Sequence, residues 1–202
     1  MTSTAHWDSV WQSRQAEDVS WHQPEPELSL RLIREVSTPS SSIVDVGGGA
    51  SRLVDLLVGH GYRDLTVVDI AEGALDQARS RLAAEASLIT WVTGDITDHD
   101  FGRTFEVWHD RAVLHFLTEE ADRDRYLATM RRSLDPGAHA IIATFAPDGP
   151  DRCSGLPVRR YRERELTAAL GDAFAPVRHH RELHVTPAGA SQSFIYGLFR
   201  RR

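Results

Sequence analysis

The stretch from 43 to 53, Ile-Val-Asp-Val-Gly-Gly-Gly-Ala-Ser-Arg-Leu, decides the fold. Its first four residues suit a buried strand, three glycines follow, and an apolar helical pattern continues to Val58. Glycine lets the backbone bend sharply after the strand and approach a bound molecule with no Cβ atoms in the way. The pattern therefore predicts a strand, a tight turn and a helix that together hold a cofactor.

The glycines do not fit the dinucleotide-binding fingerprint. Counting G-x-G-x-x-G from Gly47 and Gly49 places the third glycine position at Arg52, so NAD is disfavoured. Asp45, two residues before the first glycine, instead suits a cofactor with a cationic amino-acid end. The segment Asp45-x-Gly47-Gly48-Gly49 resembles motif I of the class I S-adenosylmethionine (SAM) dependent methyltransferases. A glycine-rich turn alone is equally compatible with a purely structural turn.

The next predicted strand strengthens the resemblance. Residues 65–69 read as a buried strand that ends in Asp69, about two dozen residues after Asp45. An acid that binds ribose hydroxyls is expected at that distance, and Ile70 should border the same cofactor. Asp69 would also suit the cap of a helix that begins near Glu72, and the two roles are compatible.

A third predicted strand, 87–92, leads into Gly94-Asp95-Ile96. The family resemblance implies that Asp95 binds the adenine amino group and that Ile96 packs against the ring face. Three successive strands that each end near an acid are more specific than any one of them.

The length of 202 residues suits one α/β domain whose sheet is covered on both faces. Two long strands, 175–185 and 191–201, are predicted at the C-terminus, and a terminal antiparallel hairpin is what the class I methyltransferase fold would have. The resemblance, which covers residues 41–201, implies a doubly wound, mostly parallel seven-stranded α/β sheet. We expect one domain of residues 1–202, with a core at 41–202 and a helical lid at 1–36.

Composition excludes several classes of function. The net charge of −6 and the pI near 5.9 argue against a nucleic-acid partner. Cys153 is the single cysteine, so neither an intramolecular disulfide nor a Cys-rich metal site is possible. No apolar run approaches the ~20 residues of a membrane span. We expect a cytoplasmic protein with no metal and no membrane contact, as a monomer or homodimer.

Residues 4–36, which precede the first predicted strand and are called the leader below, carry three of the five tryptophans, Trp7, Trp11 and Trp21. Trp7 and Trp11 are four residues apart and share one helix face. They would either attach the leader to the domain or lie over the cofactor with their rings toward a sulfonium or a substrate. We expect Trp11 and Trp21 at the cofactor and His22 facing the substrate.

A second informative stretch, 105–117, should place Asp110 and Arg111 at the carboxyl end of a central strand, where open α/β sheets bind ligands. Trp108-His-Asp110-Arg111-Ala resembles the Trp-Asp-Arg-Gly segment of the thiopurine methyltransferases, with one residue inserted. It is also similar to the Asp-Lys-Gly-Thr-Leu-Asp segment of the elongation-factor lysine methyltransferases. The motif does not choose between a small-molecule and a protein substrate.

His115 follows Arg111 by four residues and is expected on the same helical face. As a group that titrates near neutrality it would remove a proton from a thiol or hydroxyl, with Asp110 as the alternative base. A histidine packed under the cofactor is an equally good interpretation.

A long loop, 146–161, again follows a strand at its carboxyl end and is too apolar for a flexible linker. We expect it to cover the substrate, with Tyr161 inside and Arg159 or Arg160 near an anionic substrate group.

The resemblance therefore implies an enzyme that transfers a methyl group from SAM, with S-adenosyl-L-homocysteine as product. The aromatic leader and the absence of a basic face favour a small soft nucleophile, a thiol above all, with Arg111 raising the thiolate fraction. A protein-lysine N-methyltransferase is the alternative within enzymes. A regulatory protein that binds SAM without catalysis is the alternative outside them.

Overall fold

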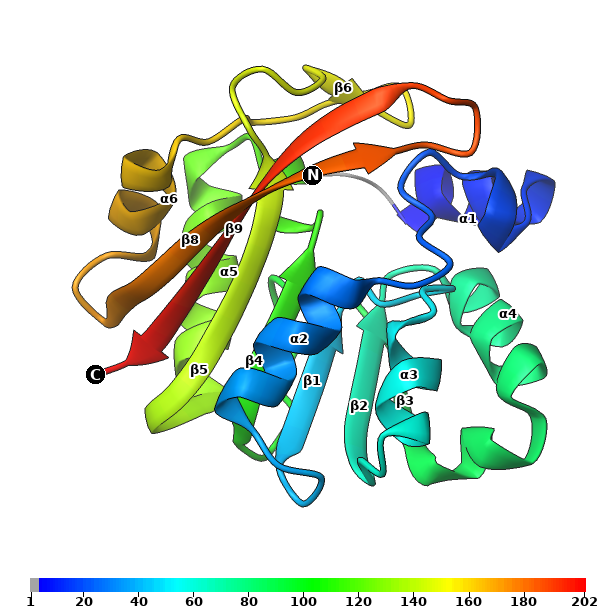
Figure 1. Cartoon of the computed structure of the whole chain (residues 1–202), viewed down its shortest axis with the longest axis horizontal. Coiled ribbons are helices and arrows are strands. Elements are labelled where there is room, and N and C mark those ends of the chain that lie inside the picture. Colours follow the sequence, from blue (N-terminus) through cyan, green and yellow to red (C-terminus); the bar gives the residue numbers. More distant parts are fainter. Residues whose placement is uncertain (1–3) are drawn as a thin grey trace.

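The computed structural model describes residues 4–202. A seven-stranded sheet runs through the molecule in the order β3-β2-β1-β4-β5-β9-β8 (Figure 1). The strands β1 to β5 are parallel to one another, and β9 pairs antiparallel with both β5 and β8. This confirms the doubly wound sheet with a terminal hairpin. The strands are β1 (Ser42–Val46), β2 (Asp64–Asp69), β3 (Ile89–Thr93), β4 (Phe105–Arg111), β5 (Leu134–Phe145), β8 (Phe174–Val185) and β9 (Ser191–Arg201).

Helices cover both faces of the sheet and form two separate cores. One core joins α2 (Glu27–Val36), α3 (Leu53–Gly59) and α4 (Glu72–Leu82) to Ile43 and neighbouring strand residues. The other joins α5 (Glu120–Arg132) and α6 (Glu163–Leu170) to Val44. Successive strand residues point to opposite faces, so a strand buried on both sides is apolar at most of its positions. That requirement explains the continuous apolar runs that predicted β1 and β2.

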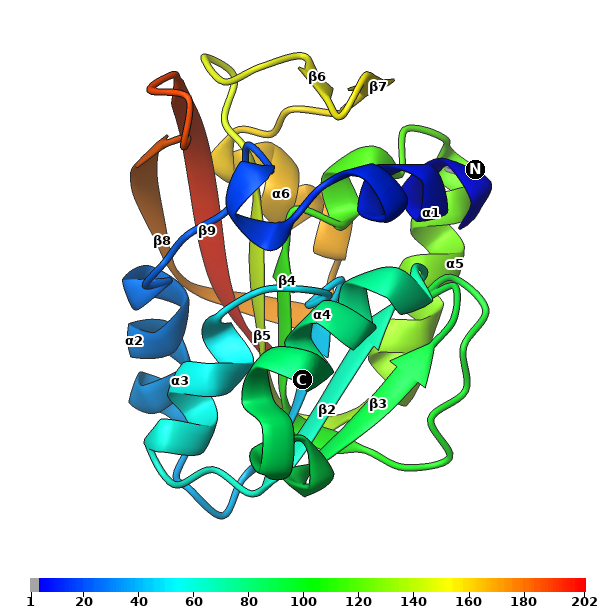
Figure 2. The same cartoon turned by 90° about the vertical axis from the view of Figure 1, so that its right-hand side faces the viewer.

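The leader lies across the carboxyl ends of the parallel strands (Figure 2). Over the strand ends lie α1 (Thr4–Ser13) and a 3-10 turn η1 (Ala16–Asp18), and α1 contacts α4. The last helix of the predicted lid, α2, instead packs on a face of the sheet. On the other side of the same edge is the loop 146–161, which contains a small hairpin of β6 (Arg152–Cys153) and β7 (Leu156–Pro157). Two further 3-10 turns are η2 (Ala83–Leu88) and η3 (Leu114–Phe116).

Some predicted boundaries were wrong. The turn formers Asp135-Pro136-Gly137 predict that the fifth strand begins at Ala138. β5 instead begins at Leu134, because this segment forms an irregular start to the strand, with Gly137 at φ 95°. Thr118 is predicted from its residue type to cap the following helix. The residue before α5 is instead Glu119, and it makes no side-chain cap. β3 begins at Ile89 and not at residue 87.

Within residues 4–202, no helix has both the length and the apolar character needed to cross a membrane. The same part of the chain contains no group of three His, Cys, Asp or Glu side chains arranged to hold a metal ion.

Candidate functional site

Two adjoining hollows lie at the carboxyl ends of the parallel strands, where open α/β sheets bind their ligands. The larger encloses about 950 Å³ and the smaller about 570 Å³, counting space open to solvent. Trp11, Trp21, Val46, Gly47 and Arg111 line both, so the hollows are parts of one site.

The glycine turn after β1 separates the two hollows and has no room for side chains. Gly47 has φ +64°, and a Cβ there would lie 2.1 Å from Val113 Cγ2. Gly49 has φ +39°, and a Cβ would lie 2.7 Å from Asp69 Oδ2. At Gly48 a Cβ would meet Asp45 Oδ2 at 2.5 Å. The turn is therefore packed against two of the predicted cofactor-binding acids.

Asp69 and Asp95 both line the larger hollow, as do Ile70 and Ile96. Asp69 Oδ1 accepts a hydrogen bond from the Ala71 amide at 2.9 Å, and burial raises the pKa of Asp69 to about 7. Asp95 Oδ1 accepts from the amide and the hydroxyl of Thr97 at 2.9 and 2.8 Å. Each acid is held by its own following turn, which leaves a second carboxylate oxygen for a ligand.

Asp45 lies in the smaller hollow and is buried, with 4% of its surface exposed. Its Oδ1 is 2.7 Å from His109 Nδ1, and His109 Nε2 is 2.9 Å from the hydroxyl of Ser29 on α2. Sequence reasoning missed His109 and Ser29 as site residues. The available signal was the pairing of β1 with β4, because Asp45 and His109 are the polar residues at one register position.

Arg111 lines both hollows and binds residues from several elements. Its Nε donates to the Tyr196 hydroxyl at 2.9 Å, and its Nη1 donates to the Trp21 carbonyl at 3.0 Å. Nη2 lies 3.6 Å from Glu182 Oε2 and has no hydrogen-bond partner among the described residues. The guanidinium also stacks over the ring of Phe194 at 4.5 Å. One cation thus connects β4, the terminal hairpin and the leader.

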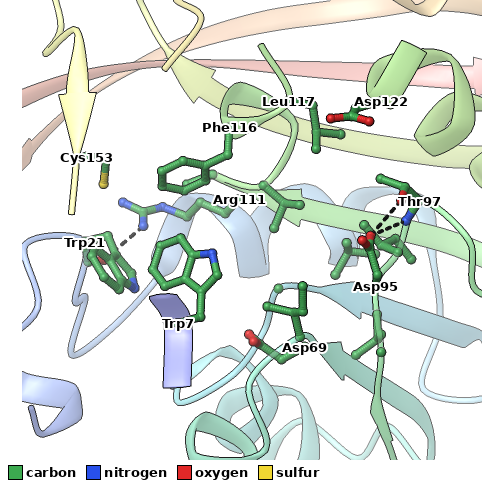
Figure 3. A pocket seen from close by; sticks show the side chains of 18 of the residues that line it. Trp7, Trp21, Asp69, Asp95, Thr97, Arg111, Phe116, Leu117, Asp122 and Cys153 are labelled. Atoms are coloured by element: carbon green, nitrogen blue, oxygen red, sulfur yellow. Dashed lines mark hydrogen bonds between the residues drawn. The ribbon is translucent and has the colours of Figure 1, made fainter. Parts of the chain in front are cut away.

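Aromatic rings surround this cation. Trp7 packs edge-on against Trp21 and Phe116, with ring centroids 5.9 and 5.1 Å apart, and Trp11 packs against Trp21 at 6.2 Å. Figure 3 shows Trp7, Trp21, Phe116, Arg111 and Cys153 gathered at one end of the hollow, with Asp95, Thr97 and Asp122 at the other. The site therefore has an aromatic, cationic end and a carboxylate-rich end.

Trp21 is fixed from the hairpin as well. His184 Nε2 lies 2.8 Å from the Ser20 carbonyl, and Gln192 Nε2 donates to the Ser20 hydroxyl at 3.3 Å. Flanking a predicted turn, His184 and Gln192 are expected from sequence to be solvated or to border the pocket. Both side chains are instead buried, and neither lines a hollow.

Asp110 and His115 were expected to act as the base, but neither lines either hollow. Asp110 is fully buried and accepts hydrogen bonds from the amides of Val113 and Leu114 and from the Tyr126 hydroxyl. Burial raises the pKa of Asp110 to about 6. Its bonds hold the turn that follows β4.

His115 does not share a helical face with Arg111, because β4 ends at Arg111 and the chain turns through Ala112 at φ 76° into a 3-10 turn. The ring is fully buried against Phe116 and Phe145. Burial lowers the pKa of His115 to about 3. Both findings agree with a packed histidine, as in the alternative interpretation, but the ring lines neither hollow in which the cofactor is expected.

The three predicted substrate residues lie in different places. His22 lines the smaller hollow, and burial lowers the pKa of its ring. Tyr161 is fully buried outside both linings, and Arg159 is exposed with its guanidinium over the Tyr161 ring at 5.1 Å. Cys153, to which the sequence assigns no role at the site, lines the larger hollow, and burial raises the pKa of its thiol to about 11. The orientation of a loop without periodicity cannot be deduced from its residue types.

The sequence is similar to a family of methyltransferase domains and to several known proteins. Residues 43–137 match a family model described as a methyltransferase domain. The eEF1A lysine and N-terminal methyltransferase of Bos taurus is 27% identical over 151 residues, which are 71% of this chain and 22% of that protein. Nodulation protein S of Rhizobium tropici is 28% identical over 115 residues, 57% of this chain and 48% of that protein. The chain thus spans between about a fifth and a half of these relatives.

Solved structures share the whole fold. A protein from work on the conversion of a disulfide bond into a thioacetal group during echinomycin biosynthesis superposes with a TM-score of 0.78 at 19% identity, covering 98% of this chain and 93% of that one. The N-methyltransferase NodS from Bradyrhizobium japonicum WM9, in complex with S-adenosyl-L-homocysteine, gives 0.72 at 20% identity, covering 96% and 97%. The chain has the fold of the class I SAM-dependent methyltransferases, and its segment 43–137 matches a methyltransferase-domain family.

Proposed function

We propose that the protein binds SAM and transfers its methyl group to a small-molecule acceptor, above all to a thiol. The observation that carries the proposal is the arrangement of Asp45, Asp69 and Asp95 at three successive strand ends around a turn that tolerates no Cβ. NodS, with the same fold, holds S-adenosyl-L-homocysteine.

The residues present fit this cofactor. Asp69 has a carboxylate oxygen directed at the glycine turn and suits ribose hydroxyls, and Asp95 with Ile96 suits an adenine amino group and ring. Asp45 in the adjoining hollow suits the α-ammonium of the methionine part. When bound, SAM supplies an electrophilic methyl group. The chain's own contribution is to orient both reactants and to exclude water under Trp7, Trp11 and Trp21.

The aromatic end of the larger hollow contains no histidine among the described lining residues, and its one thiol, Cys153, has a raised pKa. A site without a base favours an acceptor that loses its proton readily. A free thiol has a pKa near ~8.5, and the cation of Arg111 favours the thiolate. The structure that superposes with a TM-score of 0.78 belongs to work on the conversion of a disulfide bond into a thioacetal group, which is chemistry at sulfur.

A protein-lysine acceptor is the second candidate. It rests on the similarity of 71% of this chain to a methyltransferase of eEF1A lysines and N-termini. The aromatic end would then hold an extended side chain in place of a free small molecule.

The test measures S-adenosyl-L-homocysteine release from SAM with parallel panels of small thiols, phenols and amines and with a protein extract. Turnover confined to thiols supports the first candidate, and turnover confined to the extract supports the second. SAM binding with no turnover in any panel would support a regulatory protein that binds SAM without catalysis. Failure to bind SAM would contradict all three.

Variants of Arg111 test the acceptor end. Arg111→Lys keeps the positive charge and Arg111→Gln removes it. Both variants lose the guanidinium that donates hydrogen bonds to Tyr196 and Trp21 at the same time. If the charge favours a thiolate, the lysine variant retains more thiol turnover than the glutamine variant. Equal losses would assign Arg111 to holding Trp21 alone.

A further inference from the structure

The motif I acid belongs to a buried chain of three side chains that also reaches the leader. Ser29 on α2, His109 on β4 and Asp45 on β1 are 1%, 2% and 4% exposed. Their two contacts are 2.9 Å, from the Ser29 hydroxyl to Nε2, and 2.7 Å, from Nδ1 to Asp45 Oδ1. All three residues line the smaller hollow.

The direction of these hydrogen bonds follows from the groups involved. An ionised carboxylate only accepts, so His109 Nδ1 carries the proton that Asp45 receives. In the neutral ring, Nε2 is then an acceptor, and the Ser29 hydroxyl donates to it. The ring is therefore held from two elements besides its own strand.

The second oxygen of Asp45 is directed elsewhere. A Cβ at Gly48 would lie 2.5 Å from Asp45 Oδ2, so this oxygen faces the glycine turn at the wall of the smaller hollow. With Oδ1 bound to His109, the carboxylate cannot rotate without losing a buried hydrogen bond. Its free oxygen thus stays aimed at the position proposed for the methionine part of the cofactor.

Stability does not account for this chain of groups. A buried ionic or polar pair can often be replaced by packed apolar residues with no loss of stability, and the neighbouring positions Val44, Val46 and Val107 show that these strands readily bury such residues. A desolvated imidazole with a partner at each nitrogen, beside a carboxylate with one oxygen bound and one free, is more typical of a site that must present that oxygen in one orientation.

We propose that His109 is a positioning residue that orients Asp45 toward the α-ammonium of the cofactor, and that Ser29 makes helix α2 part of this support. The inference rests on the proposed function, since it concerns how the same cofactor is held. It predicts that substitutions of His109 weaken the binding of the amino-acid part of the ligand and do not change the binding of the nucleoside part.

The test compares two ligands that differ in that end. S-Adenosyl-L-homocysteine has the α-ammonium, and 5′-methylthioadenosine lacks the amino-acid part. Dissociation constants are measured by titration calorimetry for the wild type, His109→Asn, His109→Gln and Ser29→Ala, and thermal unfolding reports whether each variant is folded. The asparagine amide can replace Nδ1 toward Asp45, and the glutamine amide can replace Nε2 toward Ser29.

For His109→Gln we expect S-adenosyl-L-homocysteine to bind about 10- to 100-fold more weakly, as for the loss of a hydrogen bond to a charged group, with 5′-methylthioadenosine unchanged within about twofold. His109→Asn should stay within about threefold of the wild type for both ligands. Ser29→Ala should weaken S-adenosyl-L-homocysteine alone by about three- to tenfold.

Equal weakening of both ligands, or wild-type affinity in all three variants, would overturn the inference. If His109→Gln does not fold, the selectivity of Ser29→Ala for the ligand with the ammonium decides. A wild-type protein that binds neither ligand would overturn the proposed function itself, which is a different result from equal binding by wild type and variants.

Discussion

At the scale of single residues, the ionisation of Asp69 should control cofactor affinity. Burial raises its pKa to about 7, so the folded, ligand-free protein holds a proton there that the unfolded chain, with an aspartate pKa near ~3.9, has lost. Ionisation of Asp69 therefore lowers stability as pH rises from about 4 through about 7. A ribose that donates two hydroxyls favours the carboxylate, so binding should strengthen over the upper part of that window.

We expect S-adenosyl-L-homocysteine to bind about tenfold more weakly at about pH 6 than at about pH 8, by titration calorimetry at both values. Asp69→Asn should bind weakly at both pH values with most of this difference removed. A pH dependence that survives in Asp69→Asn would assign the titration to another group, of which His22 in the adjoining hollow is the first to examine.

Asp110 is the residue for which structure and sequence disagree most. Replacing it by Ala should lower the free energy of unfolding by about 2–4 kcal/mol, because two amides and the Tyr126 hydroxyl lose their buried acceptor. Asp124→Ala on the exposed side of α5 is the matched control and should change it by less than about 0.5 kcal/mol. Chemical denaturation measures both. An Asp110→Ala protein as stable as the control but without turnover would restore its role as the base.

The predicted helical face shared by Arg111 and His115 was wrong for a local reason. The residues after a strand were assigned helical spacing, but Ala112 takes φ 76° and reverses the chain there. A positive φ at a residue other than glycine depends on its surroundings, here the bonds to Asp110 and the packing of Val113 against Gly47. Residue types alone do not encode it.

At the scale of elements, the strand–turn–helix from 43 to 58 could be predicted because its signals are local. The apolar run, the three glycines and the return of helical periodicity require no knowledge of distant residues. The same holds for the terminal hairpin, and for α6, which the helical pattern from about 163 to 170 before Gly171 predicts. Their predicted positions agree with the structure to within about one residue. The pairing of Asp45 with His109 needed the register of two strands 64 residues apart in sequence, and no local pattern provides it.

The glycine turn offers a controlled experiment. Gly47 and Gly102 have nearly equal φ values of +64° and +63°, but a Cβ at Gly47 would lie 2.1 Å from Val113 Cγ2 and one at Gly102 would meet nothing within 4 Å. Alanine at either site carries the strain of a positive φ, of the order of 1 kcal/mol. Only Gly47→Ala also displaces the turn.

We therefore expect both variants to show a modest fall in melting temperature, larger for Gly47→Ala, with loss of S-adenosyl-L-homocysteine binding in Gly47→Ala alone. Differential scanning fluorimetry with and without the ligand measures both effects. Equal ligand-induced shifts in the two variants would mean that close backbone approach at Gly47 is not needed.

At the scale of the whole molecule, the site is closed by segments far apart in sequence. The leader is held to the sheet through Ser20 and Trp21 by Arg111, His184 and Gln192. The loop 146–161 is joined to β8 by the ion pair of Asp148 with Arg181. The sequence predicted that both segments lie over the site, from the position of the loop after a strand and from the tryptophans. It did not predict that the terminal hairpin anchors the leader.

The leader should be the part of the molecule that responds most to ligand. Helix α1 has no buried residue and is ten residues long, which is too short to be stable in water by itself. It lies over the hollow through the partly buried Trp7 and Trp11, so a ligand beneath it adds contacts that oppose its opening. A ligand at about 100 times its dissociation constant adds about 2.7 kcal/mol to the free energy of global unfolding. When a segment opens locally, its hydrogen exchange is slowed only by the contacts between that segment and the ligand.

Hydrogen exchange with mass spectrometry therefore tests the lid. With saturating S-adenosyl-L-homocysteine we expect exchange in residues 4–25 to slow by about tenfold or more, and exchange in α6, which lies outside both linings, to change little. Trp7→Ala should reduce the protection of the leader while the glycine turn stays protected. Protection confined to the glycine turn and the ends of β2 and β3 in the wild type would show that the ligand binds without the leader, and would leave the three tryptophans the role of attaching α1 to the domain.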